Sequence, residues 1–125
     1  MPVALVVEDE PEFSAFVISA FERIGFNAFA IEYTGNSSEI VNQSSDAEVL
    51  FINLTAQGDE LELAQVVLRQ WPTIRLILLS AKMGSPHAIP PVVFVRKPTT
   101  PAVLIAMIEH VAQSANHLPG SGILH

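Results

Sequence analysis

The sequence predicts an α/β domain with a doubly wound parallel sheet of five strands and helices on both faces. Five short apolar runs are spread along the chain, and amphipathic helical patterns separate most of them. Half of the 125 residues are hydrophobic and only 15% are charged. A chain of this length and composition can therefore bury one core of its own.

The predicted strands are runs of four or five residues rich in Val, Ile, Leu and Phe. They cover residues 3–7, 28–31, 49–52, 76–79 and 92–95, of which the second is the least apolar. Apolar and polar residues do not alternate within these runs. Uninterrupted runs are typical of strands that are buried on both faces, as in a parallel sheet with right-handed crossovers.

The first predicted helix follows the first strand, where apolar residues from Phe13 to Ile24 recur at helical spacing. Pro11 suits the first turn of this helix and Gly25 its C-terminal end. A second apolar stripe covers residues 61–71.

The last predicted helix carries a third stripe over residues 104–111. Thr100 is placed to cap its N-terminus, and Pro101 suits its first turn. Residues 37–43 are predicted as a short helix.

The connection between the fourth and fifth strands, residues 81–91, is short for a parallel crossover. Such a crossover normally needs a dozen or more residues and a helix. Three prolines in it oppose a long helix, namely Pro86, Pro90 and Pro91. We therefore expect the helix of this crossover to be short or absent.

The composition excludes several classes of function. With 6 Lys and Arg against 13 Asp and Glu, the formal net charge is −7. Nucleic acids and anionic membranes require clustered cations, so neither is an expected partner. The absence of cysteine excludes disulfides, thiolate metal ligands and cysteine nucleophiles. Without a long apolar span or a basic segment before the first apolar run, a cytoplasmic protein is expected.

Polar residues follow four of the predicted strands, at the carboxyl ends where ligand sites of parallel sheets lie. In chain order these residues are Glu8, Asp9, Glu10, Asn53, Ser80 and Lys97. The first turn lacks the glycine-rich loop that binds phosphates, and its three acids would repel a nucleotide or a flavin phosphate. We therefore expect no cofactor.

Three segments together resemble the receiver domain of bacterial two-component response regulators. They are Val-Val-Glu-Asp-Glu-Pro at residues 6–11, residues 76–81, and the Lys-Pro pair at 97–98. The resemblance covers roughly residues 3–113 and implies a flavodoxin-like fold with strand order 2-1-3-4-5. A receiver-like domain of residues 1–114 is expected, followed by a flexible tail, residues 115–125, that contains Pro, Gly and Ser.

The resemblance also implies roles for residues at the strand ends. Glu8 and Asp9 match the acidic pair that binds Mg²⁺ in the family. Ser80 matches the hydroxyl that contacts the incoming phosphoryl group, and Lys97 matches the lysine that pairs with it. Phe94 matches an aromatic residue that rotates on activation.

One departure from the family pattern decides the functional prediction. Asn53 stands where the family has its phosphate-accepting Asp, and an amide is not a nucleophile toward phosphoryl groups as a carboxylate is. An amide also supplies a weaker Mg²⁺ ligand. The sequence thus resembles a degenerate receiver, or pseudo-receiver. We expect no phosphorylation at position 53, weak or absent Mg²⁺ binding at Glu8 and Asp9, and Lys97 paired with Asp9.

Each of these residues also has a simpler interpretation. Glu8 and Asp9 could serve only to place negative charge at a helix N-terminus. Ser80 could be a small turn residue, Lys97 a solvated side chain and Phe94 ordinary core.

The sequence therefore predicts a phosphorylation-independent protein-interaction module without enzymatic activity. Two alternatives stay open: a phosphotransfer receiver that accepts phosphate on another carboxylate such as Asp9, and a flavodoxin-like module that binds a small molecule. The expected partner is a signalling protein or a second copy of the chain. It would dock near residues 81–91, where a missing helix would leave apolar strand surface exposed.

Overall fold

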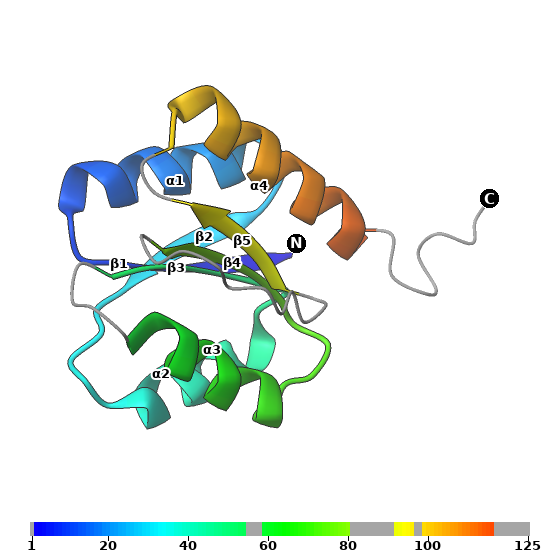
Figure 1. The fold of residues 1–125 in the computed structure, drawn as a ribbon. Helices are drawn as coiled ribbons and strands as arrows, with labels where there is room; N and C mark the ends of the chain where they lie inside the picture. The colour runs from blue at the N-terminus through cyan, green and yellow to red at the C-terminus, as the bar shows by residue number, and fades with distance from the viewer. Residues whose placement is uncertain (1, 55–58, 81–91, 97–98, 117–125) are drawn as a thin grey trace.

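The structure is a computed structural model that describes residues 2–54, 59–80, 92–96 and 99–116. Within these residues the chain alternates between strands and helices (Figure 1). The elements are β1 (Val3–Glu8), α1 (Pro11–Arg23), β2 (Asn27–Ile31), α2 (Ser37–Gln43), η1 (Ser44–Asp46), β3 (Val49–Asn53), α3 (Asp59–Gln70), β4 (Arg75–Ser80), β5 (Val92–Arg96) and α4 (Pro101–Asn116).

The five strands form one parallel sheet in the order β2-β1-β3-β4-β5. The predicted fold class and strand order are therefore confirmed. The register places Glu8 opposite Asn53, and Asn53 opposite Leu79. The last residues of β1 and β3 thus end side by side at the carboxyl edge of the sheet.

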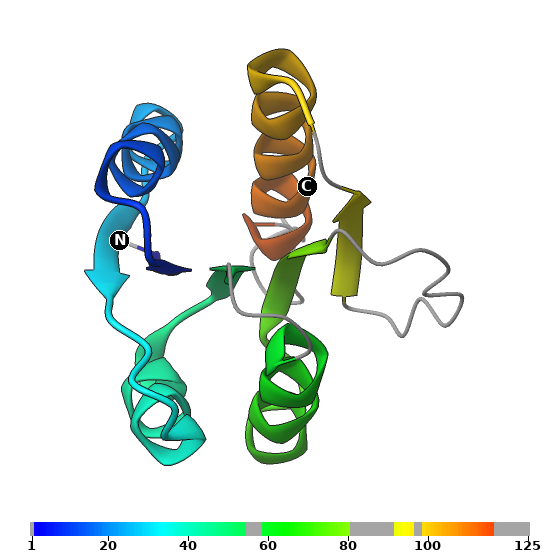
Figure 2. The same ribbon diagram turned by 60° about the vertical axis from the view of Figure 1, so that its left-hand side comes forward.

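Helices cover both faces of the sheet, with α1 and α4 on one face and α2 and α3 on the other (Figures 1 and 2). Consecutive strand residues point to opposite faces. Ala4 and Val6 accordingly join the core cluster under α1 and α4, whereas Leu5 and Val7 join the cluster under α2 and α3. Both faces of β1 need apolar side chains, which explains why its run shows no polar alternation.

The predicted signals at the helix ends are confirmed. Pro11 occupies the first turn of α1, and Gly25 follows that helix with φ +96°, in the left-handed region that favours glycine. The hydroxyl Oγ1 of Thr100 accepts a hydrogen bond of 3.2 Å from the N–H of Val103 and caps α4. The predicted short helix is α2, which the Asn36 side chain caps.

The expected short or absent fourth crossover helix falls on residues 81–91, which lie outside the described residues. The flanking strands are described. Leu76 and Leu78 of β4 are buried in the same cluster as Leu63 and Val67 of α3, and Val92 of β5 is buried as well. Because α3 packs on β4, Leu76 and Leu78 are covered. Val92 is buried as well, so none of these three side chains forms the exposed apolar surface that was expected there.

The last helix continues past the predicted domain boundary at residue 114. α4 extends through Asn116, and the rest of the expected tail, residues 117–125, lies outside the described residues. None of the helices in the described ranges is long and apolar enough to cross a membrane.

Candidate functional site

The candidate site lies where β1 and β3 end. Glu8 is the last residue of β1 and Asn53 the last residue of β3. Both side chains are only 9% exposed, although both are polar. Polar side chains are buried at this level when neighbouring groups satisfy them, so their contacts define the chemistry of the site.

Asn53 and Glu8 form a direct hydrogen bond. The Asn53 amide Nδ2 donates to Glu8 Oε1 at 2.5 Å, and the backbone N–H of Glu10 donates to Glu8 Oε2 at 2.9 Å. Each carboxylate oxygen of Glu8 therefore already accepts one hydrogen bond from the protein. The Asn53 carbonyl oxygen Oδ1 is buried without a hydrogen-bond partner.

Burial raises the pKa of the Glu8 carboxyl above its ordinary value, because removal from water disfavours the charged form. The hydrogen bonds from Glu10 and Asn53 oppose this increase, and the nearby negative charges of Asp9 and Glu10 add to it. Glu8 thus sits in surroundings that do not fully compensate its negative charge.

The remaining predicted site residues are only partly described. Asp9 follows Glu8 and is exposed. Ser80 is the last residue of β4, one position beyond the Leu79 that lies opposite Asn53. Phe94 lies opposite Leu78 in the register of β4 and β5. The side chains of Ser80 and Phe94 are not among those that the structure describes, and Lys97 lies outside the described residues.

The pairing of Asn53 with Glu8 was not predicted. From the sequence, Lys97 was expected to pair with Asp9, and Asn53 was expected to be a missing nucleophile and a weaker Mg²⁺ ligand. A signal for the contact was present, because both residues end neighbouring strands and therefore lie next to each other in a parallel register. The two residues are 45 positions apart in the sequence, and it is the register of β1 and β3 that brings them together.

The donor set at this edge fits Mg²⁺ poorly. Mg²⁺ requires near-octahedral oxygen ligation from carboxylates and waters. The two Glu8 oxygens already accept hydrogen bonds, and Asn53 directs its amino group toward Glu8. Within the described ranges no group of three or more His, Cys, Asp and Glu side chains is placed to hold a metal ion. Of the predicted acidic pair, Asp9 is the exposed member, and Asn53 Oδ1 is a buried amide oxygen.

An amide at the end of β3 also changes what the site can do chemically. A carboxylate there could attack a phosphoryl group, whereas the Asn53 amide has no comparable nucleophilic oxygen. The arrangement instead joins two buried polar side chains across the β1–β3 pair.

No protein-family model and no curated protein matches the sequence. Solved structures match it in fold. A response regulator receiver protein from Sinorhizobium medicae has a TM-score of 0.70 and 18% identity, over 91% of this chain and 96% of its own. A response regulator receiver domain protein from Bacillus halodurans has a TM-score of 0.72 and 18% identity, over 89% and 97%.

A third match comes from the crystal structure of the histidine kinase ThkA in complex with the response regulator protein TrrA. Its TM-score is 0.66 at 19% identity, with 89% of this chain and 98% of the matched chain covered. The strand order, the positions of Glu8 and Asn53 at the strand ends and these matches lead to one conclusion. The chain has the fold of the response-regulator receiver domain.

Proposed function

We propose that this protein is a degenerate receiver that works as a phosphorylation-independent protein-interaction module in signalling, without enzymatic activity. The hydrogen bond between Asn53 and Glu8 carries the proposal. The donor of this bond is an amide at the end of β3, where the resemblance to receivers implies a phosphate-accepting Asp. It also engages the carboxylate that the resemblance assigns to Mg²⁺.

The mode of action follows from this pairing. A receiver that is switched by phosphate needs a nucleophile and a metal at the strand ends. Here the buried pair is held together by a hydrogen bond within the protein, so the domain has one resting arrangement at this edge. One solved structure of the same fold is a complex with a histidine kinase, which supports a protein as the partner class.

We further propose residues 81–91 as the docking segment. Eleven residues join β4 to β5, fewer than a parallel crossover with a helix normally needs. Since Leu76, Leu78 and Val92 are buried, we assign the docking contacts in this proposal to residues 81–91 and not to these strand residues.

Intact-mass analysis after incubation with acetyl phosphate and Mg²⁺ tests the loss of phosphorylation. The wild type should keep its mass, whereas Asn53→Asp should gain one phosphoryl group because the substitution restores a carboxylate nucleophile. Asn42→Asp, which makes the same chemical change at an exposed position on α2, is the matched control and should not gain mass.

A phosphoryl group on the wild type would overturn the proposal. If peptide mapping placed that group on Asp9, the phosphotransfer alternative would replace it. A phosphoryl group on Asn42→Asp but not on Asn53→Asp would show that the end of β3 is not the acceptor position.

A further inference from the structure

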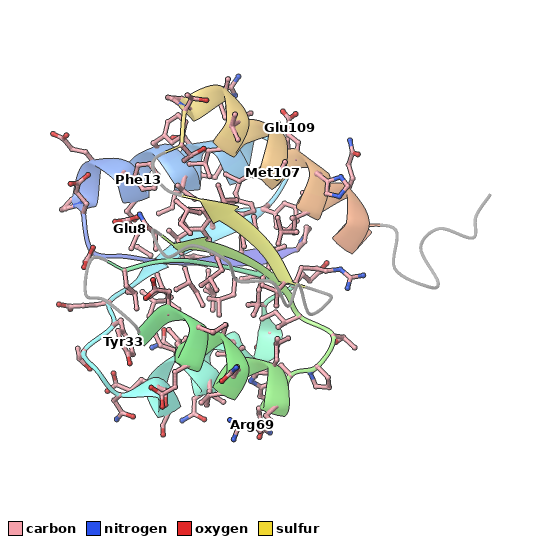
Figure 3. All side chains as sticks on the ribbon, in the orientation of Figure 1. Glu8, Phe13, Tyr33, Arg69, Met107 and Glu109 are labelled. Atoms are coloured by element: carbon pink, nitrogen blue, oxygen red, sulfur yellow. The ribbon has the colours of Figure 1, made fainter. Side chains whose placement is uncertain are left out.

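A groove opens at the carboxyl ends of β1 and β2, beside α1. Its volume is about 640 Å³, within the range of small-molecule sites. Figure 3 shows Glu8 and Tyr33 at this same end of the sheet.

Small side chains keep the groove open. Ala15 on α1 and Ala30 on β2 both line it, and both are exposed. β2 is an edge strand, paired with β1 on one side only in the sheet. A larger side chain at position 30 would therefore project into the space beside α1 and fill it.

The groove is acidic. The carboxylates of Glu8, Asp9 and Glu32 line it, and none of the described lining residues is Lys, Arg or His. The burial of Glu8 means that part of this negative charge lies away from water. A cation is the ligand that such a wall complements, because electrostatic attraction grows as water is excluded.

Ser14 gives an independent indication of a ligand. It lines the groove from α1, is only 6% exposed, and its hydroxyl Oγ has no hydrogen-bond partner. A buried polar atom without a partner costs free energy, and the great majority of such atoms are paired in native proteins. An N–H donor of a bound molecule would satisfy this hydroxyl.

We propose that the groove binds a small organic cation, a primary ammonium or guanidinium group attached to an apolar body. The cationic group would contact the exposed carboxylate of Glu32 and donate to Ser14 Oγ, with the other carboxylates adding negative charge nearby. The apolar body would pack on Ile18 and Leu54, and the ring of Tyr33 offers a cation–π contact. The site shares Glu8 with the strand-end pair, but this binding does not depend on whether the domain accepts phosphate.

Titration of the ¹⁵N-labelled protein with 2-phenylethylamine tests the proposal, with 2-phenylethanol as its uncharged counterpart. The amine should produce saturable backbone shifts at Ser14, Ala30 and Tyr33 at millimolar or lower concentration. The alcohol should bind at least about fivefold more weakly, since it lacks the charge.

Three variants locate the binding. Ala30→Leu, which fills the groove, should lower the affinity for the amine by about tenfold or more. Glu32→Gln should lower the affinity for the amine by about twofold to fivefold, as expected for an exposed charge pair. It should leave the affinity for the alcohol unchanged. Glu109→Gln removes one exposed carboxylate from α4, far from the groove (Figure 3). It should change the affinity for neither ligand.

Three results would overturn the proposal. One is the absence of saturable shifts with the amine, and another is equal affinity for the amine and the alcohol. The third is a loss of affinity in Glu109→Gln as large as that in Glu32→Gln, which would indicate a general charge effect. The spectrum of each free variant shows whether it is folded, and the exposed Glu32 gives a test that does not depend on Ala30→Leu.

Discussion

At the scale of single residues, the unusual feature is a carboxylate and an amide buried against each other at the ends of β1 and β3. Glu8 accepts hydrogen bonds at both oxygens, which favour its charged form. Burial has the opposite and larger effect and raises the pKa of Glu8. The net result is a buried acid whose ionisation works against folding.

The substitution Glu8→Gln should change how stability depends on pH. Because the pKa of Glu8 is raised in the folded protein, the folded state holds more protons than the unfolded state between the ordinary value of 4.5 and the folded value. The favourable contribution of Glu8 is fully present below the unfolded pKa. It is lost as the pH rises through the folded pKa.

The free energy of unfolding of Glu8→Gln, minus that of the wild type, should therefore increase as the pH rises from 4.5 through the raised folded pKa of Glu8. The increase should be about 1.4 kcal/mol for each pKa unit by which the folded value is raised. Urea denaturation at a series of pH values measures it, with the exposed Glu109→Gln as the control for loss of one charge. A flat or decreasing difference, or an equal rise in the control, would contradict the prediction.

At the scale of elements, α1 is held by an apolar stripe rather than by its polar face. Val17, Ala20 and Phe21 of α1 are buried in the cluster that α1 and α4 share with the sheet. The Phe21 ring packs edge-on against Phe26, with centroids 5.5 Å apart and an interplanar angle of 60°. This contact links the end of α1 to the residue that leads into β2.

Phe21→Ala should lower the free energy of unfolding by about 3–5 kcal/mol, because it leaves a cavity where the side chain is fully buried. Phe29→Ala makes the same chemical change on β2, where the ring is 52% exposed, and should cost less than about 1 kcal/mol. Urea denaturation compares the two. Similar decreases in the free energy of unfolding for the two variants would show that burial of the side chain does not determine its contribution to stability.

At the scale of the whole molecule, the helices of the described residues are divided evenly between the two faces of the sheet (Figures 1 and 2). Among the described residues, the large apolar side chains left exposed are scattered over different elements: Phe29 on β2, Leu61 on α3 and Val103 on α4. Single exposed apolar residues are normal on protein surfaces. They give no reason to move the docking surface away from residues 81–91.

If the partner that docks on residues 81–91 is a second copy of the chain, the docking can be measured as self-association of the purified protein. If a second copy docks there, the wild type should show concentration-dependent sedimentation, and Ile89→Glu should abolish it by placing a charge in an apolar contact. Val103→Glu introduces the same residue at an exposed position of α4 and should leave sedimentation unchanged. A wild type that is monomeric at all concentrations, or a loss of association in Val103→Glu instead, would contradict the prediction.

Much of the fold follows from local sequence features. The apolar runs locate the strands to within a residue or two, since strands buried on both faces must be apolar throughout. Pro11, Gly25 and Thr100 mark helix ends through backbone geometry and capping, which depend on a few neighbouring residues. The short turn η1 was not predicted, because Ser44–Asp46 carries no pattern that distinguishes it from a loop.

The sequence by itself determined the kind of sheet, the acidic end of β1 and the presence of an amide at the end of β3. The strand order came from the resemblance to receivers and was then confirmed by the pairing. Only the tertiary structure decided that Asn53 donates to Glu8, because the register of β1 and β3 is set by contacts over the whole sheet. It also decided that Ala15 and Ala30 leave a groove beside an edge strand, since the space between two elements depends on how they pack and not on either sequence segment alone.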